Sequence, residues 1–508
     1  MKINSSVLTL CYIYIGRVYS AIIAVLLIPY FIKLLGREAY GLIGYFIVLQ
    51  ACLSIFDVGI GGVLTRQAIR SVNSKKNFDA FIKLFYKAVL FFISISGLIF
   101  IAGYLSSDIF VDFLNTKIPS SIISESIFLM LSIFSVRYIQ GPFRSILLAA
   151  EKQILLTSLN VLYVTISQIF VYILLFEHNN IIYYFKLQLL ASIINTVLII
   201  FFGFIVLYSM QKESGKACAN DEHVSTGSFR SMLFFATQLS VLSILWVMVN
   251  QSDKVVLAKY LPLNEYASYS IAISFVGMLS VFGDPLNQYL QPKLTSLFYK
   301  KKYLEYTSIF NKCLDFSFLI TIPLSLFLVF FSDKLIYIWT QNYSLAYQIS
   351  KYLPWLFIGG VFSFYSNFVF LLLYSVGRLK YHTIVYSLFS IIIVPLNIYF
   401  AKTYLGEGTS LFYLINTIVL FLVWGGYIFS KYFYNGFYSI MLKILPLALI
   451  NYLFYFLVDK INFGSILYKP FVLFSILLLI GTVAVGITLV YLLVINKLIK
   501  CGGIRVEQ

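Results

Sequence analysis

Charged residues are scarce in this chain of 508 residues. They make up 11% of the sequence, whereas hydrophobic residues make up 60%. Soluble domains carry about 25% charged residues, so a water-soluble fold could not hide this much apolar surface. We therefore expect an all-α, polytopic membrane protein. The net charge of +17 does not imply a nucleic-acid partner, because in such a protein the position of the cations matters more than their sum.

Motifs for metal, nucleotide or catalytic sites are also missing. The five cysteines form no CxxC pair, so neither a disulfide framework nor a metal cluster is indicated. The three histidines, His178, His223 and His382, are far apart in the sequence, and we expect them at loop or interface positions. No GxxxxGK[ST], HExxH or Gly-x-Ser-x-Gly motif occurs. This excludes ATP-driven transport by the chain alone and argues against an enzyme.

Long apolar runs fill most of the chain. A helix needs about 20 apolar residues to cross the hydrocarbon core of a bilayer, and this rule predicts about fourteen spans. The first is expected to be a retained span and not a signal peptide, because no small-residue cleavage site follows it. The predicted spans lie near residues 7–32, 40–63, 84–104, 122–149, 154–176, 184–209, 232–258, 266–289, 308–331, 351–375, 382–401, 408–429, 438–458 and 471–495.

A polar segment, "QKESGKACANDEHVSTGSFR", separates the first six spans from the next six. The predicted domains are an N-terminal six-helix bundle, a cytoplasmic linker, a second six-helix bundle, and two further helices with a cytoplasmic tail. They cover residues 1–210, 211–231, 232–432 and 433–508.

Lysine and arginine gather in alternate loops. Short loops rich in these residues stay in the cytoplasm, which places both termini there. The same cations are expected to touch anionic lipid headgroups. The basic loops contain Arg66, Arg70, Lys75, Lys76 and Lys83, then Lys293, Lys300, Lys301 and Lys302, and the linker and tail add Lys212, Lys216, Arg230, Lys497, Lys500 and Arg505.

The sequence repeats itself at one constant shift. Leu35 aligns with Leu261, and Tyr40 aligns with Tyr266, so the turn in "YFIKLLGREAYGLIGYF" recurs in "KYLPLNEYASYSIAISF". At the same shift the lysine pair at 75–76 aligns with the pair at 301–302. Because six is an even number of spans, both copies enter the membrane from the same side. We expect parallel repeats about an axis along the membrane normal, with a cleft between two bundles.

Two segments carry a resemblance to a known family. "IPYFIKLLGREAYGLIGYF" resembles the first hairpin of bacterial polysaccharide exporters, and "SDKVVLAKYLPLNEYASYSIA" resembles the end of their seventh helix. Pro262 departs from the glycine that the family often has there. With fourteen spans arranged as six, six and two, the chain resembles the Wzx-type O-antigen flippases of the multidrug/oligosaccharidyl-lipid/polysaccharide exporter superfamily.

Several arginines fall inside predicted spans, where ionised groups are costly and usually functional. Arg17 lies in the first span, and Arg137 and Arg144 lie in the fourth. Arg137, Gln140 and Arg144 share one face of a helix that we expect to be kinked at Gly141-Pro142. They are candidates to bind an anionic headgroup, because guanidinium groups match phosphate oxygens. Alternatively, Arg17 forms a structural ion pair with Asp57, and Arg144 extends to the cytoplasmic surface.

Acidic residues are the second group of candidates. Asp57 in the second span and Asp284 in the eighth nearly correspond under the repeat, and either could carry a coupling proton or Na⁺. Alternatively, Asp284 caps a helix that is broken at Pro285. Asp253 and Lys254 lie near the external end of the seventh span, where an interfacial pair is expected.

The resemblance implies a transporter that flips an undecaprenyl-pyrophosphate-linked oligosaccharide across the bacterial inner membrane, driven by a cation. It implies membrane lipids as surroundings, with polymerase and chain-length proteins of the glycan pathway as partners, and no cofactor besides a coupling Na⁺ or H⁺. Two alternatives remain at this point. A multidrug/cation antiporter of the same superfamily would have twelve spans, and a membrane O-antigen polymerase or glycosyltransferase would need a large external loop.

Overall fold

The computed structural model describes residues 5–53, 60–72, 75–106, 111, 113–214, 229–433, 436–461 and 470–498. These residues form α-helices, two short π-helical segments, turns and loops, with no β-strand in the described ranges. The all-α prediction is confirmed. The chain divides into two compact units, Met1–Ala267 and Ser268–Gln508.

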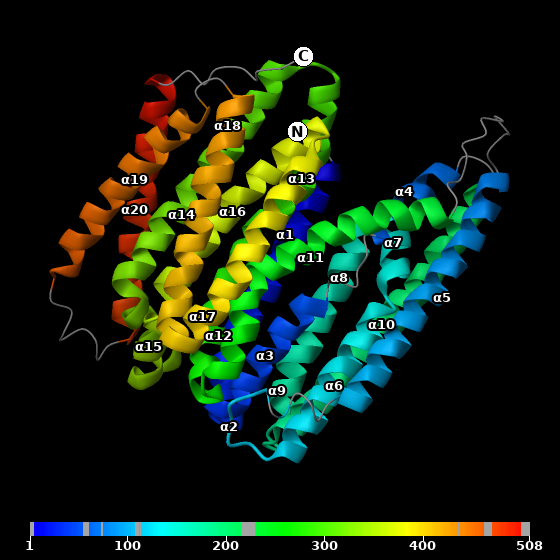
Figure 1. Cartoon of the computed structure of the whole chain (residues 1–508), viewed down its shortest axis with the longest axis horizontal. Helices are drawn as coiled ribbons and strands as arrows, with labels where there is room; N and C mark the ends of the chain where they lie inside the picture. Colours follow the sequence, from blue (N-terminus) through cyan, green and yellow to red (C-terminus); the bar gives the residue numbers. More distant parts are fainter. Residues whose placement is uncertain are drawn as a thin grey trace. The chain divides into compact units, whose positions relative to one another are not determined.

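The first unit begins with a helix interrupted at Leu27 and continues through long helices (Figure 1). α12 begins in this unit and ends in the second. The helices are α1 (Ser5–Leu26), α2 (Ile28–Leu35), α3 (Arg37–Leu53), α4 (Ile60–Ser71), α5 (Lys75–Ser106), α6 (Ser120–Tyr138), α7 (Gly141–Ala149), α8 (Gln153–Val164), η3 (Thr165–Phe170), α9 (Val171–Leu174), α10 (Ile181–Ser214), α11 (Phe229–Tyr260) and α12 (Leu263–Gly277).

A hydrophobic core of aliphatic and aromatic side chains holds α4, α5, α7 and α10 of the first unit together. Phe92 on α5 stacks on Tyr138 at the end of α6, with ring centroids 4.7 Å apart. Phe85 meets Phe143 edge to face at 5.5 Å. Such ring pairs contribute about 0.5–1.5 kcal/mol beyond the apolar area they bury, so they fix the relative positions of these helices.

The second unit contains the longest helices of the chain. One residue, Leu405, has non-helical dihedral angles (φ 52°, ψ −142°) and bends α17 sharply. The elements are α13 (Leu279–Tyr299), α14 (Tyr303–Thr340), α15 (Tyr343–Ser350), α16 (Leu353–Val376), α17 (Leu379–Leu420), η4 (Phe421–Gly425), α18 (Gly426–Tyr432), α19 (Gly436–Asp459) and α20 (Pro470–Leu498).

Eleven stretches of described residues are long and apolar enough to cross a membrane. One of them, Leu379–Tyr432, has 54 residues and holds two spans separated by the bend at Leu405. α11 also has the length of a span, with 32 residues, and α3 and α4 together match the second predicted span. The described helices therefore fit the predicted set of about fourteen.

The helix boundaries repeat at the shift found in the sequence, which aligns Leu35 with Leu261. α3 begins at Arg37, and α12 begins at its equivalent, Leu263. α8 begins at Gln153, and α17 begins at its equivalent, Leu379. The residue two positions before each of these two helices has a positive φ. It is Glu151 before α8 and Gly377 before α17.

The predicted domain boundaries are based on the sequence repeat, whereas the two compact units are defined by the contacts between residues in the structure. α11 packs against α3 and α4, so it is grouped with the first unit although the repeat makes it the first helix of the second copy. The boundaries at residues 210 and 232 remain a prediction.

Both tight turns of the repeat are present, and the helices that follow them, α3 and α12, are in contact within the first unit. Gly36 (φ 86°) separates α2 from α3, and Leu261 and Pro262 separate α11 from α12. Gly41 has no room for a Cβ beside the carbonyl of Leu263. The Leu263 amide donates to the Asn115 carbonyl at 3.0 Å. Glycine is needed at position 41 because the two backbones approach so closely.

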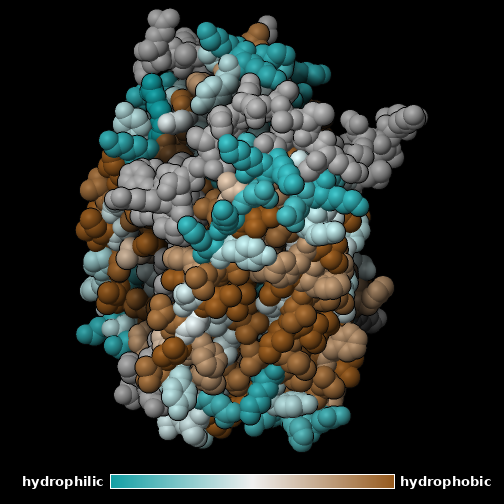
Figure 2. All heavy atoms as spheres, turned by 90° about the vertical axis from the view of Figure 1, so that its right-hand side faces the viewer, coloured by the Kyte–Doolittle hydropathy of each residue, from teal (hydrophilic) through white to brown (hydrophobic). Residues whose placement is uncertain are grey.

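Apolar side chains cover the outside of the first unit. Figure 2 shows a broad hydrophobic belt on this face, with hydrophilic side chains above and below it. Leu98 and Ile101 on α5 and Val197 and Phe201 on α10 are each more than half exposed. A patch of this extent is expected of a surface that faces lipid. The chain is a multi-pass membrane protein.

Candidate functional site

Arg17 is positioned by close packing between α1 and α8. Gly16, the preceding residue, has no room for a Cβ beside the methyl group of Thr157. Two hydrogen bonds of 2.9 Å flank this contact, from Tyr12 to Ser158 and from Tyr19 to Thr165. Arg17 is partly buried at the middle of this seam, so its place is set by helix packing.

Arg137 lies in the last turn of α6 and reaches the same helix, α8. Its guanidinium carbon is 5.0 Å from the centroid of the Tyr163 ring, and the residue is partly buried. A cation over an aromatic face gains about 0.5–2 kcal/mol and keeps its charge. α8 thus packs against the helix that carries Arg17 and also contacts the side chain of Arg137.

The expected kink near Gly141-Pro142 is confirmed, because α6 ends at Tyr138 and α7 begins at Gly141. The glycine is required there by the Phe92 ring, which leaves no room for a Cβ. Gln140 is buried in the break and donates to Thr196 Oγ1 at 2.6 Å. Because the helix is interrupted, the spacing of Arg137, Gln140 and Arg144 does not describe one regular helix face. Arg144 lies on α7 and is partly buried.

The candidate acids lie in different places. Asp57 falls in 54–59, outside the described residues, so its pairing with Arg17 remains a prediction. Asp284 is exposed on α13. The proposal that Asp284 caps a broken helix is wrong, because α13 continues through Pro285 and its N-cap is Met278.

Asp253 and Lys254 form a buried ion pair on α11. Their exposed fractions are 1% and 6%, and Lys254 Nζ lies 3.0 Å and 3.2 Å from the two carboxylate oxygens. The ammonium group also donates to the carbonyl of Asn250. The phenol of Tyr266 donates to the Lys254 carbonyl at 3.3 Å. Such a pair has little net charge, and it is costly to break because either partner alone would be a buried charge.

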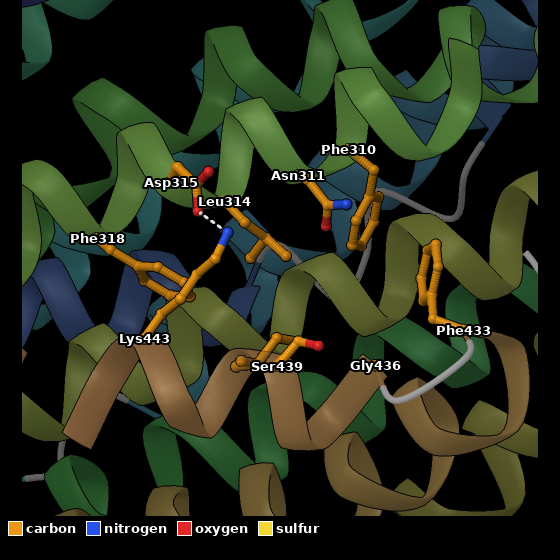
Figure 3. Close-up of a pocket in the computed structure, with 10 residues that line it drawn as sticks. Phe310, Asn311, Leu314, Asp315, Phe318, Phe433, Gly436, Ser439 and Lys443 are labelled. Carbon is orange, nitrogen blue, oxygen red and sulfur yellow. Dashed lines mark hydrogen bonds and ion pairs between the residues drawn. The ribbon is translucent and has the colours of Figure 1, made fainter. Parts of the chain in front are cut away.

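A second ion pair, between a buried lysine and a partly buried aspartate, was not predicted from the sequence. Lys443 on α19 donates to Asp315 Oδ1 on α14 at 2.7 Å, and Asn496 on α20 donates to Oδ2 at 2.8 Å. Figure 3 shows the Lys443 ammonium reaching the Asp315 carboxylate at one side of a small pocket, with Phe310, Phe318 and Phe433 around it. The available signal was a lone lysine in an apolar 24-residue helix, which usually has a partner.

Comparison with known proteins adds the family. The sequence matches the family described as "Polysaccharide biosynthesis protein" over residues 9–298, more than half of the chain. The chain belongs to this polysaccharide biosynthesis protein family. Residues 239–401 also match the MatE family. A search of curated protein sequences found no match.

Solved structures with the same fold are transporters and flippases. The lipid II flippase MurJ in an inward closed conformation matches with a TM-score of 0.63 and 18% identity, over 97% of this chain and 99% of MurJ. An inward-facing multidrug resistance MATE transporter of the MOP superfamily matches with a TM-score of 0.64 and 13% identity, over 82% of this chain and 98% of the transporter. A point mutant of a Vibrio cholerae MATE transporter matches with a TM-score of 0.60 and 14% identity, over 83% of this chain and 97% of the transporter. At these identities the likeness establishes the fold, which is that of the MOP superfamily.

In this polysaccharide biosynthesis protein, three cations inside spans, Lys254, Lys443 and Arg137, show two arrangements. Lys254 and Lys443 are each bonded to a neighbouring carboxylate. Arg137 instead rests on an aromatic ring, and among the described residues it has no carboxylate partner. Only the second arrangement leaves a positive charge for an anion to approach.

Proposed function

We propose that this protein flips a lipid-linked oligosaccharide from the cytoplasmic to the outer leaflet of the bacterial inner membrane by alternating access. The cargo is an O-antigen or capsule repeat unit on undecaprenyl pyrophosphate. The family match over residues 9–298 carries this proposal, and the fold shared with a lipid II flippase supports it. A hydrophilic glycan cannot cross about 30 Å of hydrocarbon unaided, because its hydroxyl groups would lose their hydrogen bonds to water.

In this proposal the first unit binds the pyrophosphate. Arg17 and Arg137 both lie beside α8, and Arg144 lies on α7, the helix between α6 and α8 in the chain. A guanidinium group forms two parallel hydrogen bonds with phosphate oxygens, which suits a headgroup that must be held and released. Cation coupling, by H⁺ or Na⁺ at Asp57 or Asp284, belongs to the same proposal.

One observation favours a second candidate, a multidrug/cation antiporter. The MatE family matches residues 239–401, and MATE transporters share the fold. An antiporter of this kind would lower the sensitivity of cells to cationic drugs and would leave surface glycan unchanged when its gene is deleted.

The test is deletion of the gene, followed by analysis of the surface and of lipid-linked intermediates. We expect loss of long surface glycan and accumulation of single lipid-linked units on the inner face of the membrane. Accumulation on the outer face would point to a polymerase, and unchanged glycan with increased drug sensitivity would point to the antiporter. Either result would contradict the proposed flippase.

A further inference from the structure

His382 is buried in the second unit, at the start of α17. Its exposed fraction is 4%, in contrast to the exposed His178 of the first unit. Trp424 Nε1 donates to His382 Nδ1 at 3.1 Å. An indole N–H is only a donor, so Nδ1 must be an unprotonated acceptor and the imidazole must be neutral.

Aromatic rings surround the imidazole. Tyr386 on α17 lies 4.4 Å away between ring centroids, and Phe370 on α16 lies 5.9 Å away. Trp424 belongs to the π-helical segment η4 and stacks on Tyr427 at 6.0 Å. π-helical segments are frequent at functional sites.

The charged and titratable groups near His382 do not favour a cation there. Arg378 lies one turn earlier at the N-cap of α17 and donates to the phenol of Tyr432 on α18 at 3.5 Å. The packed elements carry further titratable groups, which are either cations or phenols near His382: Lys380, Tyr381 and Tyr386 on α17, Tyr365 and Tyr374 on α16, and Tyr427 and Lys431 on α18. No carboxylate bonds to His382 among the described residues. The positive end of the α17 dipole acts in the same direction as Arg378.

We propose that His382 is a proton-binding site that couples the packing of α17 and η4 to pH. A proton from water adds to the Nδ1 lone pair and gives an imidazolium with two N–H groups. Nδ1–H and Trp424 Nε1–H are then two donors facing each other, so their hydrogen bond breaks and the rings separate. Protonation therefore favours an arrangement in which the imidazolium reaches water, because a ligand shifts an equilibrium toward the state that binds it better.

The part of this inference that concerns transport rests on the proposed function, since H⁺ would act as a coupling or regulating ion. The proton site itself can be tested without any cargo. The full-length chain with Trp246, Trp339 and Trp355 replaced by Phe keeps Trp424 as its single tryptophan, and protonated histidine quenches the fluorescence of a nearby indole.

The purified single-tryptophan protein is titrated from pH 8 to pH 4 in lipid nanodiscs. We expect a reversible fluorescence change of at least twofold that is absent in His382→Asn, whose amide oxygen still accepts from Trp424 but does not titrate in this range. His178→Asn, the matched control at an exposed histidine, should titrate like the parent. A flat titration of the parent, or an unchanged titration in His382→Asn, would overturn the proton site.

Flipping of lipid-linked oligosaccharide is then measured in vesicles at the same pH values. His382→Asn should keep its rate at pH 8 within about twofold and lose the pH dependence of the parent. A pH dependence retained in the folded His382→Asn protein would overturn the coupling role. If no variant flips the glycolipid, the proposed function fails, while the fluorescence titration still decides the proton site.

Discussion

In the second unit the ammonium group of Lys443 meets a carboxylate, whereas in the first unit the guanidinium group of Arg137 meets a tyrosine ring. Lys443 is 4% exposed, and Asp315 and Asn496 complete a network that joins α14, α19 and α20. Arg137 is only partly buried, and its partner Tyr163 donates no negative charge. The cation is therefore neutralised in the first of these two sites and keeps its positive charge in the second.

A cation that is paired with a carboxylate holds neighbouring helices together, whereas a cation over an aromatic ring keeps a positive charge that an anion can approach. The Lys443 network links two helices outside the repeat to a helix inside it, and a second contact, from Tyr455 to the Pro323 carbonyl at 3.1 Å, links α19 to α14 again. In the first unit, Arg17 and Arg137 are positioned by the packing of α1, α6 and α8. This contrast predicts that substitutions in the Lys443 network mainly change stability and that substitutions of Arg17 and Arg137 mainly change transport.

The largest effect is expected for Lys443→Met. Removing the lysine leaves the Asp315 carboxylate, which is 16% exposed, without its cation. Loss of one partner costs up to about 3–5 kcal/mol of stability for a fully buried pair, and this sets the upper limit here. Thermal unfolding of the purified protein in detergent measures this loss. The double variant Asp315→Asn with Lys443→Met should regain most of it. Lys334→Met is the matched control, because its bridge to the 42%-exposed Asp459 is worth less than about 1 kcal/mol. Equal losses in both lysine variants would contradict the contrast.

Arg137→Ala and Arg17→Ala should come next, with effects on transport. A hydrogen bond to a charged group is worth about 1.5–3 kcal/mol, so loss of one guanidinium should slow flipping by about tenfold or more. Arg137→Lys should fall in between, because lysine lacks the paired donors. Membrane insertion and thermal stability should remain near the parent values. If both alanine variants export glycan at the parent rate, the arginines are structural.

Periodicity and length predicted much of the fold from sequence. Apolar runs predicted the spans, and the shift that aligns the two copies in the sequence also aligns the helix starts at Arg37 and Gln153 with those at Leu263 and Leu379. Pro142 predicted the interruption between α6 and α7. These features depend on local sequence, and each one is visible within a single stretch of the chain or in its repeat.

Pairings between distant residues could not be predicted. Asp315 and Lys443 are 128 positions apart, and nothing in either helix alone indicates which residue the other side chain meets. Asp253 and Lys254 were expected at an interface because they are adjacent and charged, and the structure buries them against Asn250. His382 was expected in a loop or at an interface. Its hydrogen-bond partner in the buried position is Trp424, which lies 42 positions later in the segment η4.

Gly16→Ala is expected to have an intermediate effect in the first unit. A Cβ at this position meets Thr157, so α1 must move away from α8, and overpacking of this kind costs about 1–3 kcal/mol. Arg17 would move with α1, so flipping should decrease together with the melting temperature. Gly97→Ala on α5 is the control, because nothing lies within 4 Å of its added Cβ. A Gly16→Ala protein with parent stability and rate would show that the packing of α1 does not position Arg17.

The smallest effect is expected for Tyr163→Leu, which removes the ring under Arg137 and keeps an apolar side chain. The lost cation–π interaction is worth about 0.5–2 kcal/mol, so flipping should slow by about two- to thirtyfold through weaker positioning of the guanidinium. Tyr163→Phe keeps the aromatic face and should stay within about twofold of the parent. Because the ring positions the cation and does not neutralise it, combining Tyr163→Leu with Arg137→Ala should be no worse than Arg137→Ala alone. An additive loss in the double variant would mean that Tyr163 acts on the cargo independently of Arg137.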